Sequence, residues 1–180
     1  IQINAQIAKG FRLGGINDPL NKPLCTPEDF ETFSNRQIYD NEELWNYEIG
    51  FKSSFNDGKA TFDASLFYAD IHDLQATVDA GSCSSRIIFN LPRARSIGIE
   101  TELHLKPHPD LDITFSASVQ DATIRSTIDD LGSSAQDILS GIKRGNRLPS
   151  SPAFQAATQI IYYWDMRNSW GGFASLNLYY

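Results

Sequence analysis

Two carboxylates, Glu100 and Glu102, lie two residues apart in the segment SIGIETELHLK. Residues at positions i and i+2 of a β-strand share one face, and paired carboxylates can perform acid–base catalysis. A polar face of a sheet accounts for the same pair without any reaction. We favour the polar face, and we expect no catalytic residues and no enzyme activity.

Three histidines and two cysteines are the other groups that could do chemistry. His72, His104 and His108 do not have the spacing of a ligand cluster, and neither Cys25 nor Cys83 belongs to a CxxC or Cys/His motif. We therefore expect no metal site and no cofactor. In an oxidising compartment the two cysteines could form a disulfide, and two free thiols are the alternative.

The composition excludes some classes of function. The chain has 180 residues and a net charge of −7, from 15 basic and 22 acidic residues. This charge argues against nucleic-acid binding, which needs clustered cations. No segment approaches the roughly 18 apolar residues of a transmembrane helix. The chain begins and ends within predicted strands and has no signal peptide, so we expect a fragment of a longer mature chain.

Alternating apolar and polar residues predict seven β-strands. The clearest pair is NYEIGFKSSFNDGKATFDASLFY, in which two alternating runs flank Asn56, Asp57 and Gly58. Asn and Gly tolerate the positive φ of tight turns, so this segment is a predicted hairpin. The predicted strands are residues 1–13, 46–55, 61–74, 86–106, 111–119, 153–164 and 171–180, with Pro92 interrupting the fourth.

The predicted connections alternate in length. Residues 16–44 and 124–151 form long irregular connections and residues 76–85 form a medium loop, whereas the other three connections are short turns. Successive connections of an antiparallel meander lie at opposite ends, so all the longer ones share one end. This asymmetry is typical of outer-membrane barrels, which have short periplasmic turns and long extracellular loops.

Aromatic residues near the strand ends also favour a membrane barrel, because amphipathic rings suit the membrane interface. They are Tyr47, Tyr68, Tyr162, Tyr163, Trp164, Trp170, Tyr179 and Tyr180. Seven strands do not close an even-numbered barrel, and an open apolar sheet would aggregate through its edges. We predict an all-β fold, an antiparallel up-and-down meander that is a fragment of a large transmembrane β-barrel. A soluble secreted β-sandwich binding module is an alternative.

Three segments resemble, in order, the C-terminal part of the β-barrel of TonB-dependent outer-membrane receptors. They are AKGFRLGGIN (8–17), ELWNYEIGFKSSFNDGKATFDASLFYADIHDLQ (43–75) and FNLPRARSIGIETEL (89–103). In that family a strand ending GFR-x-GG precedes a long extracellular loop and a W-x-Y-E-x-G-x-K strand. An N-x-x-x-A-x-x-x-G-x-E strand follows, here Asn90, Ala94, Gly98 and Glu100. The similarity covers most of residues 1–120 and continues more loosely to residue 180.

This resemblance implies a barrel of about 22 strands closed by an N-terminal plug domain. Residues 1–180 would be a partial barrel domain of about seven strands, with the plug and the remaining strands outside it. The resemblance implies a protein of the bacterial outer membrane, in contact with its lipid, that takes up a ferric siderophore or similar metal chelate. The TonB energy-coupling complex would drive this uptake. A passive porin-like channel is the alternative transporter.

Two groups of residues in the long connections are candidates for ligand binding. Aromatic side chains of the first connection could anchor it or contact a ligand: Phe30, Phe33 and Tyr39. Basic side chains at a strand mouth could attract a ferric chelate or lipopolysaccharide phosphates: Lys143, Arg144 and Arg147. Solvated loop charge is the alternative for the basic group.

Overall fold

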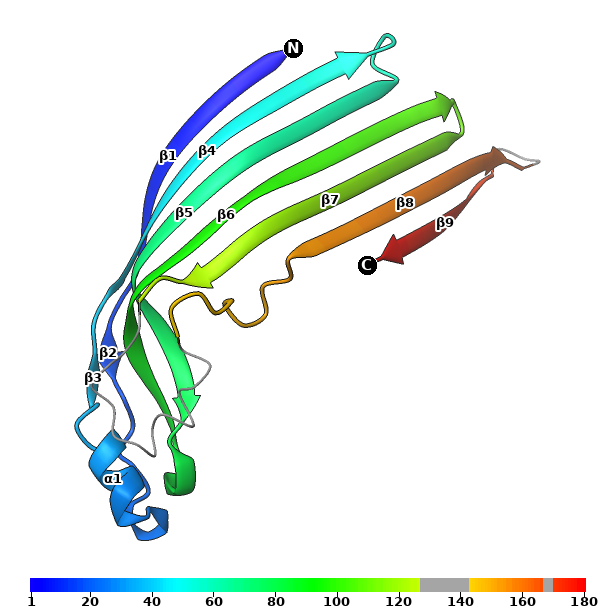
Figure 1. The fold of residues 1–180 in the computed structure, drawn as a ribbon. Helices are drawn as coiled ribbons and strands as arrows, with labels where there is room; N and C mark the ends of the chain where they lie inside the picture. The colour runs from blue at the N-terminus through cyan, green and yellow to red at the C-terminus, as the bar shows by residue number, and fades with distance from the viewer. Residues whose placement is uncertain (127–142, 167–169) are drawn as a thin grey trace.

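The protein forms one curved, antiparallel β-sheet (Figure 1). The computed structural model describes residues 1–126, 143–166 and 170–180. In spatial order the strands are β1 (Gln2–Arg12), β4 (Glu42–Phe55), β5 (Ala60–Asp79), β6 (Arg86–His108), β7 (Leu111–Ile124), β8 (Phe154–Asp165) and β9 (Gly171–Tyr179). Each strand pairs with the next one along the chain, which confirms the predicted up-and-down meander.

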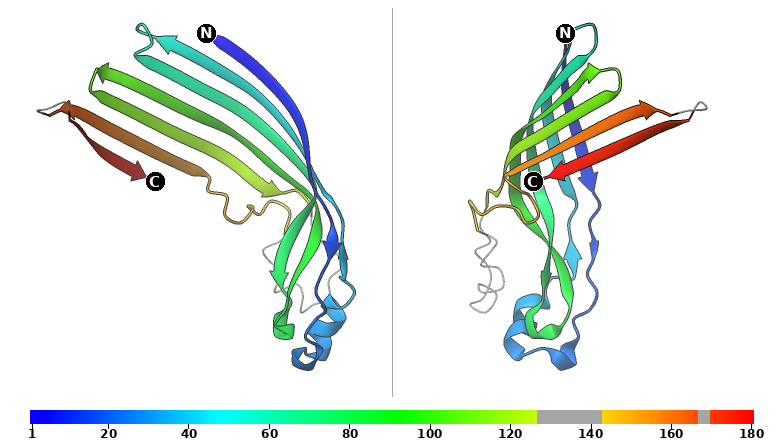
Figure 2. Two further views of the ribbon diagram at one scale, coloured as in Figure 1. Left: turned by 180° about the vertical axis from the view of Figure 1, so that it is seen from behind. Right: turned by 90° about the vertical axis from the view of Figure 1, so that its right-hand side faces the viewer.

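Small elements decorate one end of this sheet. The segment between β1 and β4 contains the pair β2 (Gly15–Ile16) and β3 (Ile38–Tyr39), the 3-10 turn η1 (Lys22–Leu24) and helix α1 (Pro27–Phe33). A second 3-10 turn, η2 (Gly81–Cys83), lies at the tip between β5 and β6. The tight turns gather at the opposite end of the sheet (Figures 1 and 2). Among the described residues, no helix has the length and apolar composition needed to cross a membrane.

One face of the sheet is an exposed apolar surface. Five apolar side chains follow one another across adjacent strands in a single register row: Ile49, Leu66, Ile99, Val119 and Phe154. Each of them is 40 to 55% exposed. Within the described part of the chain no second sheet covers this row, so the fold differs from a β-sandwich with a dry core. The apolar face is available for lipid, as a barrel requires.

Aromatic rings flank this apolar surface. Tyr47 and Tyr68 are directly opposite on β4 and β5, with ring centroids 6.2 Å apart, and Trp45 stacks on Tyr47. Tyr162 stacks on Trp164 near the tight-turn end of β8. These rings fit the predicted girdles. Tyr179 does not, because it lies on the other face, beside the polar residues described below.

The buried core lies at the loop end. Phe33 from α1 packs with Ala80, Cys83 and Ile87 at the tip of the β5–β6 hairpin, and Cys25 and Cys83 form a disulfide there. A second cluster joins Phe89, Leu91 and Ile124, with Leu74 and Leu148 against it. The loops therefore carry hydrophobic packing of their own, whereas the wall of the sheet carries almost none.

The expectation that residues 16–44 form an irregular stretch is wrong for part of that segment. Thr26 caps α1 by accepting a hydrogen bond from the Asp29 N–H at 3.2 Å. Pro27 occupies the first turn, where its missing N–H costs nothing, and Glu28 and Asp29 complement the positive end of the helix dipole. The sequence Thr-Pro-Glu-Asp is a helix-start signal that indicates α1.

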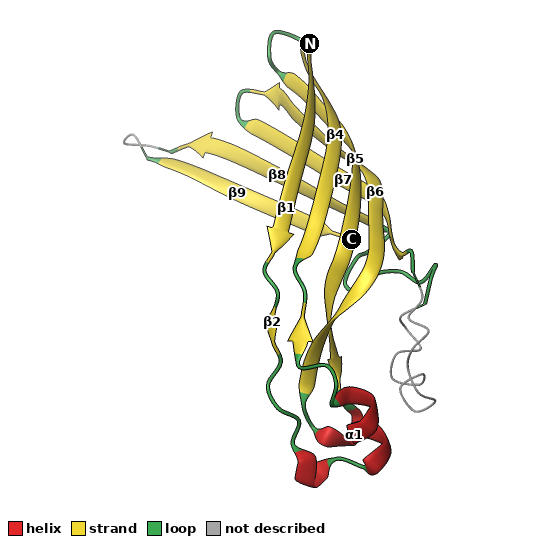
Figure 3. Ribbon diagram, turned by 90° about the vertical axis from the view of Figure 1, so that its left-hand side faces the viewer, coloured by secondary structure: helices red, strands yellow, loops and turns green. Residues whose placement is uncertain are grey.

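The expected loop at residues 76–85 is also shorter than predicted. Strands β5 and β6 continue past the sheet as a two-stranded ribbon, leaving residues 80–85 as the connection (Figure 3). β6 runs through Pro92 without a break. The register has no pair between Asp73 and Pro92, and Asp73 takes a φ of 53°, so the missing N–H of proline removes no ladder bond.

Gly98 tests the packing of the wall. A Cβ atom at Gly98 would lie 2.6 Å from the Phe67 ring and 2.6 Å from the Val119 carbonyl oxygen. We expect Gly98→Ala to destabilise the protein by about 1–3 kcal/mol through overpacking. The measurement is the melting temperature of the full-length protein in detergent. Gly10→Ala is the matched control, because a Cβ there meets nothing within 4 Å. Equal melting temperatures for both variants would contradict this packing.

Candidate functional site

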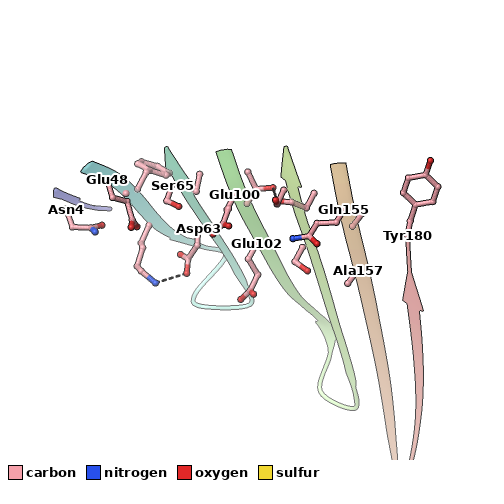
Figure 4. Close-up of a pocket in the computed structure, with 18 of the residues that line it drawn as sticks. Asn4, Glu48, Asp63, Ser65, Glu100, Glu102, Gln155, Ala157 and Tyr180 are labelled. Carbon is pink, nitrogen blue, oxygen red and sulfur yellow. Dashed lines mark hydrogen bonds and ion pairs between the residues drawn. The ribbon is translucent and has the colours of Figure 1, made fainter. Parts of the chain in front are cut away.

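The polar face of the sheet encloses an open hollow of about 750 Å³ (Figure 4). Its side chains come from six adjacent strands and from the end of β9. The polar side chains on this face are Asn4, Glu48, Lys52, Asp63, Ser65, Glu100, Glu102, Ser116, Ser118, Gln155 and Tyr179. Strand pairing places four of them in one row across β5, β6, β7 and β8: Ser65, Glu100, Ser118 and Gln155. Glu100 and Glu102 thus share a face, as predicted.

This hollow carries a surplus of negative charge. Lys52 Nζ donates to Asp63 Oδ2 at 2.8 Å, so this cation is already paired. Within the described part of the chain, no cation lies within ion-pair distance of Glu48, Glu100 or Glu102. Such a wall can hold water, cations or a hydrated domain with basic side chains.

Two glycines shape the wall. The Asn4 amide lies over Gly50, where a Cβ would be 2.5 Å from Asn4 Oδ1. The Phe67 ring lies over Gly98, its direct register partner on β6. A glycine beneath a large ring gives the ring space and keeps the neighbouring strand close. This contact explains why glycine stands in the middle of a strand at position 98.

A polar junction fastens the loops to the wall. Gln75 Nε2 donates to the carbonyl oxygens of Leu13 and Asp40 at 2.9 and 3.0 Å, while the Gln75 N–H donates to Glu42 Oε2 at 2.7 Å. Arg12 donates to the same Glu42 carboxylate at 2.6 Å. Gln75 therefore joins the end of β1, the start of β4 and the β5–β6 ribbon.

Two asparagines extend this junction. Asn90 accepts from the Asp40 N–H at 2.7 Å and donates to the Asp40 and Asp73 carbonyls at 2.9 and 2.8 Å. Asn17, which is nearly buried, accepts from the Ile88 N–H at 2.8 Å and donates to the Ile88 carbonyl at 2.6 Å. At these two places side-chain amides supply the hydrogen bonds that join the first long loop to the ribbon, in place of backbone pairing.

A small pocket of about 180 Å³ lies within the first long loop. Phe30 and Phe33 line it together with Lys22 and Arg36. Lys22 Nζ lies 5.1 Å from the centroid of the Phe30 ring. Phe33 is only 2% exposed, so of the two roles left open for it the structure supports the anchor. No local sequence signal marks Lys22 and Arg36, because they come together with the two phenylalanines only in the folded loop.

The other predicted ligand residues lie elsewhere. Tyr39 lies over Gly15 in the β2–β3 pair and does not line the pocket. Lys143 and Arg144 are exposed in the turn that precedes β8. Arg147 donates to the carbonyls of Gln120 and Ser151 and lies 3.6 Å from the Asp121 carboxylate. The structure therefore separates the aromatic group from the basic group.

The arrangement of these residues is suited to binding. Among the described residues, no group of three His, Cys, Asp or Glu side chains could hold a metal ion. His72, His104 and His108 lie each beside a different aspartate rather than beside one another. The chemistry available is that of surfaces: an acidic hollow, an apolar face, and loops with cations and aromatic rings.

Known proteins share the sequence pattern and the fold of this chain. The family model of the TonB-dependent receptor-like β-barrel matches residues 1–180. The ferric yersiniabactin uptake receptor FyuA from Yersinia pestis superposes with a TM-score of 0.60 at 19% identity, over 92% of this chain and 21% of that one. The copper transporter OprC gives 0.57 at 14% identity, over 97% and 23%.

The siderophore receptor PiuA from Acinetobacter baumannii gives a TM-score of 0.51 at 20% identity, over 88% of this chain and 22% of that one. These likenesses show a shared fold. The chain spans between a fifth and a quarter of the length of these three structures.

Asp29 makes the loop end sensitive to acid. Its carboxylate accepts hydrogen bonds from the Ser82 hydroxyl and N–H at 2.5 and 2.8 Å, and these bonds hold the pKa of Asp29 below its usual value of 3.8. Because the pKa of Asp29 is lower in the folded protein than in the unfolded chain, the ionised carboxylate stabilises the loop fully above about pH 4. This stabilisation is lost as the pH falls through the pKa of Asp29 in the folded protein.

We therefore expect acid to speed reduction of the buried Cys25–Cys83 disulfide by a water-soluble phosphine. The rate for the native protein, relative to that for Asp29→Asn, should rise as the pH falls from 5 to about 3. Glu31→Gln in the same helix is the control and should behave as the native protein. If the ratio of the native rate to the Asp29→Asn rate stayed constant over this pH range, the Asp29–Ser82 contact would not be what holds the loop.

Proposed function

The chain belongs to the TonB-dependent receptor family, a family of outer-membrane proteins, and we propose that the whole protein takes up a scarce nutrient across the bacterial outer membrane. The observation that carries this proposal is the two-sided wall. One face is apolar and exposed, and the other is polar, acidic and hollowed. A wall of this kind divides lipid from an aqueous lumen.

In this proposal the apolar face contacts the lipid of the outer membrane. The connections with loops, helix and ribbon lie outside the cell, and the tight turns at residues 56–59 and 109–110 face the periplasm. Each edge strand, β1 and β9, has one neighbour within the described residues. Lipid offers no hydrogen bonds to backbone groups, so these edges must pair with further strands to close a barrel.

The polar hollow is the surface that we propose for the plug domain. Glu48 on β4 and Glu100 and Glu102 on β6 project into the lumen, and their surplus charge suits basic side chains of a hydrated domain. Contacts of this type would keep the plug seated until the TonB energy-coupling complex acts on it. The TonB complex is a proposed partner of the whole protein.

We propose a ferric siderophore or similar metal chelate as the cargo. Two of the compared structures are a ferric yersiniabactin uptake receptor and a siderophore receptor, and a third is a copper transporter. In this chain Phe30, Lys22 and Arg36 offer an aromatic ring and two cations at the loop end. Rings and cations together suit anionic aromatic chelating groups.

The first experiment measures uptake by cells that carry the full-length protein. We expect uptake of labelled ferric chelates to stop when the energy-coupling complex is deleted, because the plug blocks passive flow. A passive porin-like channel would continue to admit the solute in the deletion strain. Carbonate-washed membranes, with gel mobility compared before and after boiling, report whether the protein is an outer-membrane barrel.

Glu100→Gln combined with Glu102→Gln tests the seating of the plug. We expect several-fold greater entry of large antibiotics into cells, since the substitutions remove two charges from the wall that faces the plug. Glu28→Gln combined with Glu31→Gln is the control, with the same change in charge at the loop end. Unchanged antibiotic entry, with a barrel that still shifts on boiling, would contradict the proposed contact.

A further inference from the structure

A group of apolar side chains lies on the polar face of the sheet, near the tight-turn end of β8 and β9. Side chains at alternate positions of a strand share a face, so Ile161 and Tyr163 lie on the same side as Gln155 and Ala157, which line the hollow. Phe173 on β9 is the register partner of Tyr163. Tyr163, a predicted girdle residue, therefore belongs to the inner, polar face. We call Ile161, Tyr163 and Phe173 the inner apolar patch.

The inner apolar patch has no cover within the described residues. Tyr163 is 41% exposed and Phe173 67%, and their ring centroids lie 6.4 Å apart. A further strand that pairs with the free edge of β9 would lie beside the patch in the sheet and leave its face open. On β8 the patch is rimmed by Gln159 on one side and Asp165 on the other. Exposed apolar surface with a polar rim marks an interaction site.

The patch differs chemically from the acidic hollow beside it. Gln159 Nε2 donates to Asn177 Oδ1 at 2.9 Å, and this neutral pair separates the two surfaces on β8 and β9. Asp112 on β7 is the register partner of Ile161, and its carboxylate lies 3.6 Å from Lys106 Nζ. This charged neighbour of the patch is thus already paired, whereas the hollow carries a surplus of negative charge. The inner face therefore offers two kinds of contact, one acidic and one apolar.

The occupant of the patch must reach the inner side of the wall. In the proposed barrel, lipid contacts the opposite face and does not cover these rings. A second copy of the chain would have to enter the lumen of a closed barrel. The plug domain, which we propose to rest on the hollow, meets the patch without a gap, because Ala157 of the hollow, Gln159 and Ile161 follow one another on the same face of β8. This continuity selects the plug, a segment of the same protein, as the occupant.

We propose that Ile161, Tyr163 and Phe173 hold an apolar surface of the plug domain in a water-free contact at the periplasmic end of the lumen. The inference rests on the proposed function and on the membrane orientation given there. The wall then contacts the plug in two ways: through charges on β4 and β6, which salt screens, and through rings on β8 and β9, which salt does not screen. Buried aromatic anchors carry a large share of the energy of an interface.

Photo-cross-linking in the full-length protein tests this contact. The photoreactive residue benzoylphenylalanine replaces Phe173 in the patch, Gln155 in the hollow or Leu176 on the outer face, and mass spectrometry identifies the cross-linked peptides. We expect plug peptides from the first two positions and none from the third. In about 1 M sodium chloride, where charges are screened within about 3 Å, the yield from Gln155 should fall several-fold, while the yield from Phe173 stays unchanged.

Substitutions in the patch separate the plug contact from the folding of the wall. Tyr163→Ser combined with Phe173→Ser should make protease cleave the plug several-fold faster at a fixed, moderate concentration of urea, because the apolar contact is lost. Tyr163→Phe combined with Phe173→Leu keeps the apolar surface and should behave as the native protein. Gln159→Ala combined with Asn177→Ala is the matched control, since it removes the neighbouring polar pair from the same two strands and should leave the cleavage rate unchanged. Gel mobility before and after boiling shows separately whether each variant remains a barrel.

Adducts from position 173 with a second copy, with another protein or with lipid alone would overturn the proposal. Equal cleavage of the plug in the serine variant and in the Gln159 and Asn177 control would overturn it too, as would a yield from position 173 that falls with salt. A native protein that neither resists carbonate nor shifts on boiling would instead refute the proposed function. A barrel that takes up its chelate only with the energy-coupling complex, yet gives no plug adduct from position 173, would refute this inference alone.

Discussion

The register of the antiparallel strands is the constraint on which the rest of the molecule depends. Side chains alternate between faces along each strand, so a row of paired residues contains one face only. The row with Ile49, Leu66 and Ile99 is apolar on every strand it crosses, while the neighbouring row contains Ser65 and Glu100. A slip of one residue would turn Glu100 toward the apolar face and Ile99 toward the polar face. The exposed apolar face and the acidic hollow therefore follow from the same hydrogen-bond ladder.

The loop end follows a different principle. Its stability comes from buried side chains, from the disulfide and from amide side chains that join segments far apart in sequence. Gln75 and Asn90 bind the backbone of residues at the two ends of the first long loop. The motifs that resemble the receptor family, from GFR-x-GG to the asparagine of the fourth strand, thus meet at one junction. Their order in the sequence reflects contacts needed to hold the loop above the wall.

The contrast explains what the sequence could predict. Strand alternation and the turn at Asn56, Asp57 and Gly58 are local signals, and the meander and both faces were predicted from them. Helix α1 also has a local signal, in Thr26 and Pro27, which the proline-rich surroundings obscured. The ribbon beyond Pro92 has no strong local signal, because it depends on pairing with β5 and on packing by Phe33 and Ile124. The loop pocket is less predictable still, since Lys22, Phe30 and Arg36 come to line it only in the folded loop.

The boundary between the sheet wall and the packed loop end places the greatest chemical demands on its side chains. Below it, apolar side chains of the wall are exposed and need no hydrogen-bond partner, and above it, the loop packs on itself. Between them the strands carry ion pairs on the outer face, of Lys9 with Glu43 and of Arg93 with Asp70. The Lys9, Glu43 and Arg93 side chains in these pairs remain about half exposed. Arg95 and Thr123 depart from this pattern, because the Arg95 Nε and the Thr123 hydroxyl are buried without a hydrogen-bond partner.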